Sequence, residues 1–396
     1  NEENRFGGVV SLFTDAPTTV VDSGTPSIIQ NGPIQVDGVA SFTAADGSIT
    51  LGNLANTFNQ LAFDSGNVFI TEGGNINLLE STATRTLDLL SAGAIEQSDR
   101  LVVNGDASFT ARQPDAAITL SSPNQFSGTI ALSTPDSASL VNTLENTQLG
   151  PLEIGRNLSI TSGGGIRQTV PIVISGRTAL DAENQDIVLS QGNDFNQLTV
   201  QGGDEVIIND INDISLDRVR VLGRITVESD RNITTQNITS LSGLIELISR
   251  SGNIDTTGGT LSSSLSTGNG GKVSLSAGQN LNVGDIEANG LAGGHISLSA
   301  EDTIAINQRR IASVTLGQGT GQGINLNADV VKVMNDGRVV SSTSGPGDAG
   351  DVEITARQLR VQGNPDQITV ITTNTTQDSA GEGGDLIVDA SESVEL

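Results

Sequence analysis

The side chains with the clearest capacity for chemistry are acidic residues that lie between short apolar runs. They are followed by two arginines, and the full set is Asp204, Glu205, Asp210, Asp213, Asp217, Arg218 and Arg220. Paired carboxylates are used for general acid and base catalysis on polysaccharides. The competing interpretation is that these residues satisfy backbone groups in turns between strands, and we favour it. No EF-hand-type loop and no tandem Gly-Gly-x-Gly-x-Asp repeat occurs, so any Ca²⁺ binding at this cluster would be weak.

The sequence contains one His, His295, and no Cys, which excludes a zinc site of the usual kind. His295 takes the place that Lys272 holds one repeat earlier, so we expect it to face solvent at the start of a strand. A Ser-His-Asp triad that includes His295 stays an alternative, although no Gly-x-Ser-x-Gly elbow is present.

The glycine clusters are not phosphate loops, because no Gly-Lys-Ser/Thr follows them. Sugar clefts usually use Trp or Tyr, and this chain has neither.

Arginine and phenylalanine form two further sets. Arginines that could face acidic polymers are Arg85, Arg156, Arg167, Arg177, Arg309 and Arg310. Single arginines on an acidic surface more often balance local charge, which is the interpretation we prefer.

The phenylalanines recur in repeat register as Phe58, Phe126 and Phe195, and as Phe42 and Phe109. An aromatic ligand-binding stripe is the alternative, but we expect buried core or corner rings.

The composition favours a narrow fold with an acidic surface. The 396 residues include 46 Asp and Glu, 19 Lys and Arg, and 47 Gly, with a formal net charge of −27. Such a surface repels nucleic acid and anionic membranes. Disorder is an alternative at this charge, but the apolar residues come in short alternating runs that disordered segments lack. The chain has no signal peptide and begins at Asn1, so we expect a processed product or an excised segment.

Internal repeats decide the expected architecture. Segments 36–44, 103–111 and 174–182 align, and the strand positions that follow them, Ile49, Ile118 and Ile187, recur at a spacing of about 69 residues. Gln97, Gln168 and Gln236 close a second shared motif. In the second half one strand motif starts at Val273, Ile296, Ile324, Val352 and Leu386, with a first interval of about 23 residues. Because three times 23 is 69, the long repeat is interpreted as three coils of one solenoid.

Each motif alternates apolar with small polar residues, which indicates a strand with one buried face. Gly, Asn and Asp between the motifs permit sharp turns. Coils of about 23 residues with three short strands predict an all-β fold, a parallel β-helix. A propeller would need longer blades with aromatic repeats, and a sandwich has no reason to keep the long repeat in register. We expect an N-terminal segment or irregular coils over 1–33, three-coil repeats over 34–240, and coils of about 23–34 residues over 241–396.

Three motifs carry a resemblance to a known family: 270–277 (GGKVSLSA), 293–300 (GGHISLSA) and 350–356 (GDVEITA), joined by the glycine-rich connector 341–349. With them the chain resembles the filamentous-haemagglutinin-like exoproteins of bacterial two-partner secretion, in particular cyanobacterial surface members, over residues 34–396. The resemblance implies a right-handed parallel β-helix that is exported through an outer-membrane two-partner-secretion transporter. The Asn-Pro-Asn and Asn-Ser-Gly motifs of the family's export domain are missing. The chain therefore resembles a shaft segment without that domain.

The predicted function is a secreted or cell-surface structural or adhesive shaft, located outside the cell, and not an enzyme. Expected partners are the secretion transporter, further copies of the chain in fibres, and surface glycans, with no nucleic acid. No catalytic, cofactor-binding or metal-binding residue is predicted. The alternative is a β-helical polysaccharide lyase or hydrolase built around Asp210 and Asp213.

Overall fold

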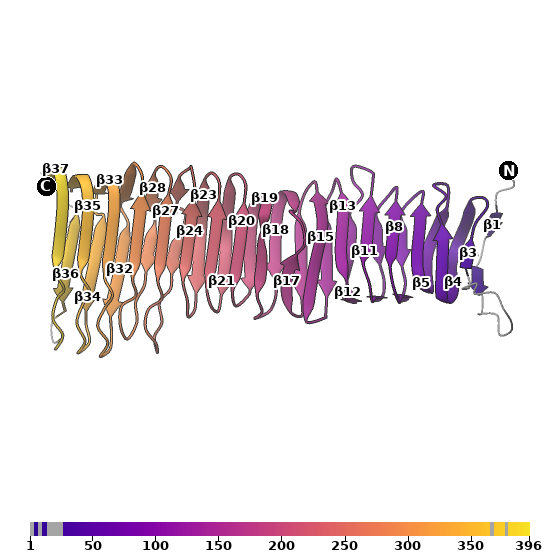
Figure 1. Ribbon diagram of the computed structural model, residues 1–396, viewed down its shortest axis with the longest axis horizontal. Helices are drawn as coiled ribbons and strands as arrows, with labels where there is room; N and C mark the ends of the chain where they lie inside the picture. Colours follow the sequence, from indigo (N-terminus) through magenta and orange to yellow (C-terminus); the bar gives the residue numbers. More distant parts are fainter. Residues whose placement is uncertain (1–3, 7–9, 14–26, 365–367, 377–378) are drawn as a thin grey trace. The chain divides into compact units, whose positions relative to one another are not determined.

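The computed structural model describes residues 4–6, 10–13, 27–364, 368–376 and 379–396 (Figure 1). Within these ranges the chain is all-β, with no helix, and its strands pair in parallel as a β-solenoid with coils of roughly 21 residues. The predicted fold class is confirmed, with coils slightly shorter than expected from the sequence. No helix in the described part of the chain has the length and apolarity that a bilayer crossing requires.

Contacts divide the chain into two units. Unit 1 comprises Asn1–Glu183 and Asn193–Phe195, and unit 2 comprises Asn184–Gly192 and Asn196–Leu396. The described strands of unit 1 are β1 (Asn4–Phe6), β2 (Val10–Phe13), β3 (Ser27–Ile29), β4 (Ile34–Leu51), β5 (Thr57–Glu72), β6 (Ile76–Leu78), β7 (Ser81–Ala83), β8 (Leu87–Ser91), β9 (Ile95–Gln97), β10 (Leu101–Val103), β11 (Ala107–Ala111), β12 (Ile118–Phe126), β13 (Thr129–Thr134), β14 (Ala138–Asn142), β15 (Asn146–Ile154), β16 (Leu158–Ser162), β17 (Gly165–Gln168) and β18 (Val173–Asp181). The expected N-terminal segment 1–33 lies largely outside the described residues.

Strand β19 (Ile187–Gly202) has residues in both units. The strands of unit 2 are β20 (Val206–Asp210), β21 (Ile214–Val221), β22 (Ile225–Ser229), β23 (Ile233–Ser240), β24 (Ile245–Ser249), β25 (Ile254–Asp255), β26 (Thr260–Ser262), β27 (Val273–Ala277), β28 (Leu281–Val283), β29 (Asp285–Glu287), β30 (Ile296–Ala300), β31 (Thr303–Asn307), β32 (Arg310–Thr315), β33 (Ile324–Met334), β34 (Arg338–Thr343), β35 (Val352–Gln362), β36 (Val370–Thr375) and β37 (Leu386–Glu395). The division of 34–240 from 241–396 by repeat length stays a prediction.

The core of unit 2 is a set of aliphatic columns. The five motif starts found in the sequence are direct register partners from coil to coil, in the order Val273, Ile296, Ile324, Val352 and Leu386. The first four of these side chains are completely buried. Each buried aliphatic side chain contributes roughly 1.5–3 kcal/mol. A thin core of Ile, Leu and Val therefore suffices without large aromatics.

The long repeat of unit 1 does not correspond to three whole coils. Ile49 follows Ile28 in a column that continues through Val68, Leu87 and Ala107, one coil at a time. Ile118, its equivalent in the next repeat, follows Ala107 by only part of a coil and pairs with Ile95 in a different column. The repeat thus spans three coils plus one strand. Equivalent residues of successive repeats consequently lie on successive faces of unit 1, and the three-coil interpretation is wrong.

The phenylalanines pack in the core. Phe42 and Phe58 contact edge to face with ring centroids 5.7 Å apart, and Phe109 and Phe126 repeat this contact at 5.9 Å. These four rings and Phe195 are at most 1% exposed. The expected core packing is confirmed, and an aromatic ligand stripe is excluded for these five residues.

Glycine in the long connectors of unit 2 allows neighbouring coils to touch through their backbones. A Cβ added at Gly347 would lie 2.1 Å from the carbonyl oxygen of Gly319, and one at Gly381 would lie 2.0 Å from that of Gly347. Any larger residue at these positions would force the stacked loops apart. The glycine-rich connectors are therefore a packing requirement of the stack.

Candidate functional site

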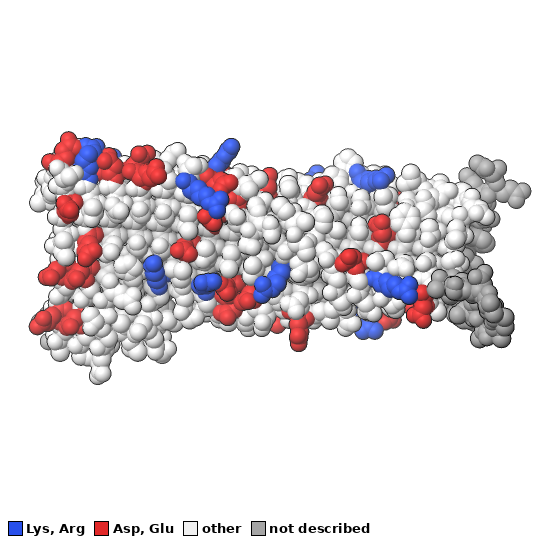
Figure 2. Space-filling model, viewed as in Figure 1, with Lys and Arg blue, Asp and Glu red and all other residues white. Residues whose placement is uncertain are grey.

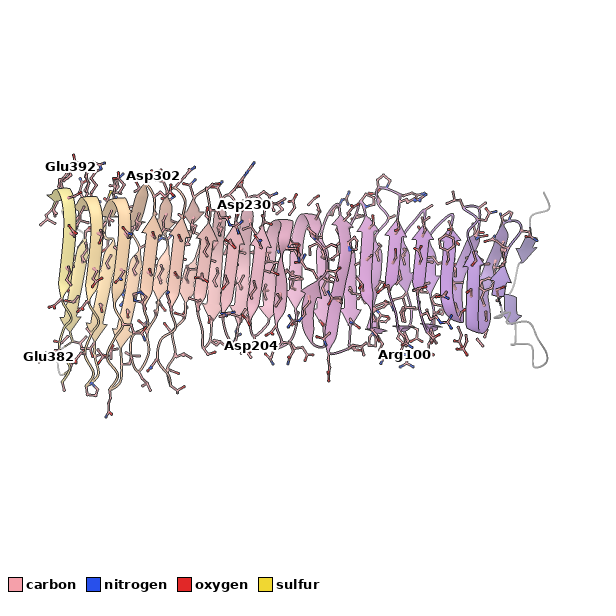
Figure 3. All side chains as sticks on the ribbon, in the orientation of Figure 1. Arg100, Asp204, Asp230, Asp302, Glu382 and Glu392 are labelled. Atoms are coloured by element: carbon pink, nitrogen blue, oxygen red, sulfur yellow. The ribbon has the colours of Figure 1, made fainter. Side chains whose placement is uncertain are left out.

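Asp204 and Asp210, two members of the acidic cluster predicted from the sequence, lie far apart. Asp204 precedes β20 and Asp210 ends it, so about six residues of extended chain, roughly 20 Å, separate them. The main-chain N–H of Asp230 donates to the carbonyl of Asp210 at 3.1 Å, and Figure 3 shows Asp204 and Asp230 at opposite edges of unit 2. Asp210 is fully buried and accepts from the main-chain N–H of Asn212 at 2.9 Å. Carboxylate pairs in glycosidases lie about 5–9.5 Å apart, which Asp204 and Asp210 do not match.

The other members of the cluster have local roles. Glu205 forms an ion pair with Arg224 of the next coil. Asp217 is half-buried, and Arg218 and Arg220 are exposed on β21. In the described part of the chain no group of three or more His, Cys, Asp and Glu residues is arranged to hold a metal ion. Asp204, Glu205 and Asp213 lie between strands, as the turn interpretation predicts. By contrast, Asp210 lies on β20, and Asp217, Arg218 and Arg220 lie on β21.

His295 lies where the repeat alignment predicted, immediately before β30. The carbonyl of His295 accepts from the N–H of Val273, just as that of Lys272 accepts from Ile245 one coil earlier, so the two residues are equivalent. The His295 ring is half-buried, and its Nδ1 lies 3.3 Å from the carbonyl oxygen of Gln322. No Ser or Asp side chain among the described residues bonds this ring. A catalytic triad is not assembled here.

The arginines chosen from the sequence divide into two groups. Arg156 pairs with Asp115 and Asp136 at 3.6 and 3.5 Å, and Arg309 pairs with Asp285 at 3.3 Å. These two balance local charge, as expected. Arg85, Arg167, Arg177 and Arg310 are exposed, and Arg167 and Arg177 also have interaction partners within the chain. The six lie at scattered positions in the two units and do not build one basic surface.

Unit 1 contains a repeated pair of Gln and Asn side chains that hydrogen-bond to each other at corners between strands. Asn124 Oδ1 accepts from Gln97 Nε2 and from the main-chain N–H of Leu101, both at 2.8 Å. Asn124 Nδ2 donates to Gln97 Oε1 at 2.9 Å and to the carbonyl of Leu120 at 3.1 Å. The Asn124 side chain is fully buried, so these bonds replace water. We call this reciprocal pair a Gln–Asn clamp.

The clamp recurs as Gln30 with Asn56 and as Gln168 with Asn193, with Gln Nε2 to Asn Oδ1 distances of 2.8 Å in both. The three clamps are spaced along the sequence by about one long repeat. Successive clamps therefore lie at different corners of the coils. The sequence pattern singled out Gln97 and Gln168 but not their partners, because Asn124 and Asn193 lie 27 and 25 residues further along the chain. Gln236 differs, since Gly258 and Gly259 lie against it and no Asn takes the partner position.

Glu72 is a buried carboxyl at another corner of unit 1. It is 1% exposed, and its two oxygens accept from the main-chain N–H groups of Phe58 and Gly74 at 2.9 and 3.2 Å. Burial raises the pKa of Glu72 to about 8, although both hydrogen bonds act in the opposite direction. Glu72 is therefore mostly protonated at neutral pH.

One face of unit 2 is lined by a ladder of amides. Asn232, Asn253 and Asn280 precede strands β23, β25 and β28, and Asp213 takes the same place before β21. Asp213 Oδ1 accepts from Asn232 Nδ2 at 2.9 Å, and Asn232 Oδ1 and Asn253 Oδ1 accept from the next Asn at 3.1 and 3.0 Å. Each oxygen also accepts the main-chain N–H of the next residue in the ladder. The ladder thus links four successive coils.

Beside this ladder lies a row of outward polar side chains, which we call the polar column. Ser215, Thr234, Asp255 and Asn282 are register partners on β21, β23, β25 and β28. Two hollows of about 450 and 600 Å³ lie over this column, and both are lined by Asp255 and Asn282. The geometry suits the binding of a hydroxylated ligand more than it suits catalysis, because these groups can donate and accept hydrogen bonds.

The fold and these features define a parallel β-solenoid repeat protein. A family model described as "Repeats of unknown function (DUF5649)" matches residues 16–62, 65–133 and 137–201, and the chain is similar to that family over these three segments. Ile49, Ile118 and Ile187 each fall in one match, in agreement with the long repeat. Comparisons with curated proteins and with solved structures find no match.

We expect the Gln–Asn clamp to stabilise unit 1. Asn124→Ala removes four hydrogen bonds and leaves the Leu101 N–H and the Leu120 carbonyl without this partner in a buried corner, at about 1–3 kcal/mol for each unsatisfied group. Urea unfolding followed by circular dichroism measures the loss. Asn104→Ala is the matched control, since Asn104 is exposed. Equal midpoints for the two variants would contradict a stabilising clamp.

The raised pKa of Glu72 predicts a pH-dependent stability. The contribution of protonated Glu72 is fully present below the ordinary pKa of 4.5 and is lost as pH rises through about 8, a change on the order of 5 kcal/mol. Glu72→Gln cannot ionise, so its stability relative to the wild type should increase steadily from pH 4.5 to 8. Glu96→Gln, at an exposed position, is the control. Parallel stability curves for Glu72→Gln and the wild type would show that Glu72 does not titrate in this way.

Proposed function

We propose that this chain is part of a secreted or cell-surface shaft that acts as a scaffold in adhesion, aggregation or filament formation. The observation that carries the proposal is the in-register stacking of coils in unit 2, which repeats one strand motif on the same face from coil to coil. Repetition of a weakly binding face raises the apparent affinity without any new contact. The function follows from repetition and geometry, and no catalytic step is needed.

The proposed setting is extracellular. The resemblance of the second-half motifs to filamentous-haemagglutinin-like exoproteins supports export through an outer-membrane two-partner-secretion transporter. The net charge of −27 and the small polar residues on the outer faces are compatible with a long-lived soluble surface protein. Nucleic acid is not a proposed partner, because acidic surfaces repel it.

Adhesion can be tested with beads that carry the full chain at low and high density. We expect bead attachment to cells to rise steeply with density, because several weak faces must engage together. Beads that carry an unrelated protein of similar net charge are the control for electrostatic effects. Attachment no better than the control at any density would overturn the adhesive function, and release of soluble fragments from a polysaccharide-coated surface would favour the enzymatic alternative.

Filament formation would bring the acidic coils of neighbouring copies together. Residues 361–396 contain seven Asp and Glu and no Lys or Arg, and Figure 2 shows acidic side chains gathered over the last coils. Repulsion between these acidic coils opposes the association of copies.

Filament formation should therefore depend on salt. The screening length falls from about 30 Å at 0.01 M to about 3 Å at 1 M ionic strength, which removes the repulsion between the acidic coils. Electron microscopy and sedimentation across this range measure the assembled fraction, which we expect to rise with salt. Monodisperse particles at every salt concentration would contradict filament formation.

A further inference from the structure

We propose that the polar column of unit 2 and the two hollows above it form a binding groove for a neutral, extended oligosaccharide. This inference rests on the proposed adhesive function and assigns the surface that would contact a glycan. The two hollows share Asp255 and Asn282, so they adjoin along successive coils. Ligand pockets usually measure about 300–1,000 Å³, and these hollows of about 450 and 600 Å³ fall within that range.

The floor of the groove offers one polar group per coil. Ser215 and Thr234 present hydroxyls, Asp255 a carboxylate and Asn282 an amide, in direct register. Neighbouring strands lie about 4.7–4.9 Å apart, so these groups recur at a spacing similar to the length of one pyranose ring. Asp255 Oδ1 accepts from the N–H and the hydroxyl of Thr257 at 2.9 and 2.6 Å. The Asn282 side chain is exposed and has no hydrogen bond among the described residues, so it can bind ligand hydroxyls.

Each hollow has a border that is fixed by hydrogen bonds within the protein. The ladder residues Asn232 and Asn253 border the hollow of about 450 Å³, and each Nδ2 donates along the ladder. Arg309 borders the hollow of about 600 Å³ and spans two coils, donating to the carbonyl of Thr257 at 2.7 Å and to Asp285 at 3.3 Å. A rigid border lowers the entropic cost of binding. Both borders are therefore organised before a ligand arrives.

Charge and apolar surface narrow the ligand class. Asp213 and Asp255 place carboxylates along the groove, and the guanidinium of Arg309 is already paired with Asp285. Sulfated or carboxylated sugars would be repelled, whereas neutral hydroxyls can donate to the carboxylates. Met334 and Ala305 add apolar surface at one end of the groove, where the C–H face of a sugar ring can rest. A neutral glycan matches this combination.

The affinity of one groove should be low. No aromatic ring lines either hollow, and a hydrogen bond that replaces one to water contributes only about 0.5–1.5 kcal/mol. We expect a Kd near the millimolar range for the isolated chain. Dense display of the chain would convert this weak binding into stable attachment.

The groove can be tested by biolayer interferometry with the full chain and immobilised hexasaccharides. The probes are a neutral β-1,4-linked N-acetylglucosamine hexamer and a sulfated hexasaccharide of equal length. We expect the wild type to bind the neutral probe and not the sulfated one. Asn282→Arg, which fills the groove, should weaken binding at least about tenfold. Asn325→Arg is the matched control, because Asn325 also points outward but lies on the face formed by β30, β33 and β35.

Thr234→Arg, two coils away from Asn282, provides a second test in case Asn282→Arg does not fold, and circular dichroism verifies the fold of each variant. Binding of the neutral probe that neither groove variant changes, or a preference for the sulfated probe, would overturn the proposal. The bead assay separates this result from the proposed function. Adhesion that Asn282→Arg leaves intact refutes the groove alone, whereas hexasaccharide binding without any bead adhesion refutes the adhesive function and leaves the groove standing.

Discussion

Main-chain hydrogen bonds between coils are the interaction on which each unit depends. In unit 2 the N–H groups of Val206, Ile225, Ile245, Val273 and Ile296 donate to carbonyls one coil further on, at 2.8–3.0 Å. These donors belong to the residues whose side chains form one core column, so a single register serves both the backbone and the core. A shift by one residue would turn every aliphatic side chain outward. Register is therefore the constraint that the remaining features must respect.

Corners are where this constraint is hardest to satisfy, because the chain leaves the regular strand and buries polar groups. Unit 1 solves the problem with the Gln–Asn clamp and with Glu72, whose oxygens bind the N–H groups of Phe58 and Gly74. Unit 2 uses the ladder from Asp213 to Asn280 at one corner and glycine-rich loops at another. The ladder residues Asn232 and Asn253 also line one of the two hollows. A device that satisfies the backbone thus also shapes the proposed groove.

The repeat length and the coil length of unit 1 do not match, and this mismatch has structural consequences. The long repeat is not a whole number of coils, so each repeat advances the chain by three coils and one strand. Clamps and phenylalanine pairs are consequently distributed over different corners and not aligned along one side. The sequence prediction equated the long repeat with three coils as long as the first one in the second half. Coil length varies along the chain, so this comparison does not give the number of coils in one repeat. Only the pairing registers reveal it.

The sequence by itself determined the strands, the inward residues and the fold class, because period-two alternation and turn residues are local signals. It also placed Val273, Ile296, Ile324, Val352 and Leu386 in one column, since their motif recurs without internal insertions. The tertiary structure decided which distant polar residues meet. Asp204 and Asp210 are close in sequence but lie at opposite ends of a strand. By contrast, Gln97 and Asn124 are 27 residues apart in sequence, and their side chains form two hydrogen bonds with each other. Contacts across coils depend on the length of each intervening coil, and no local pattern encodes that length.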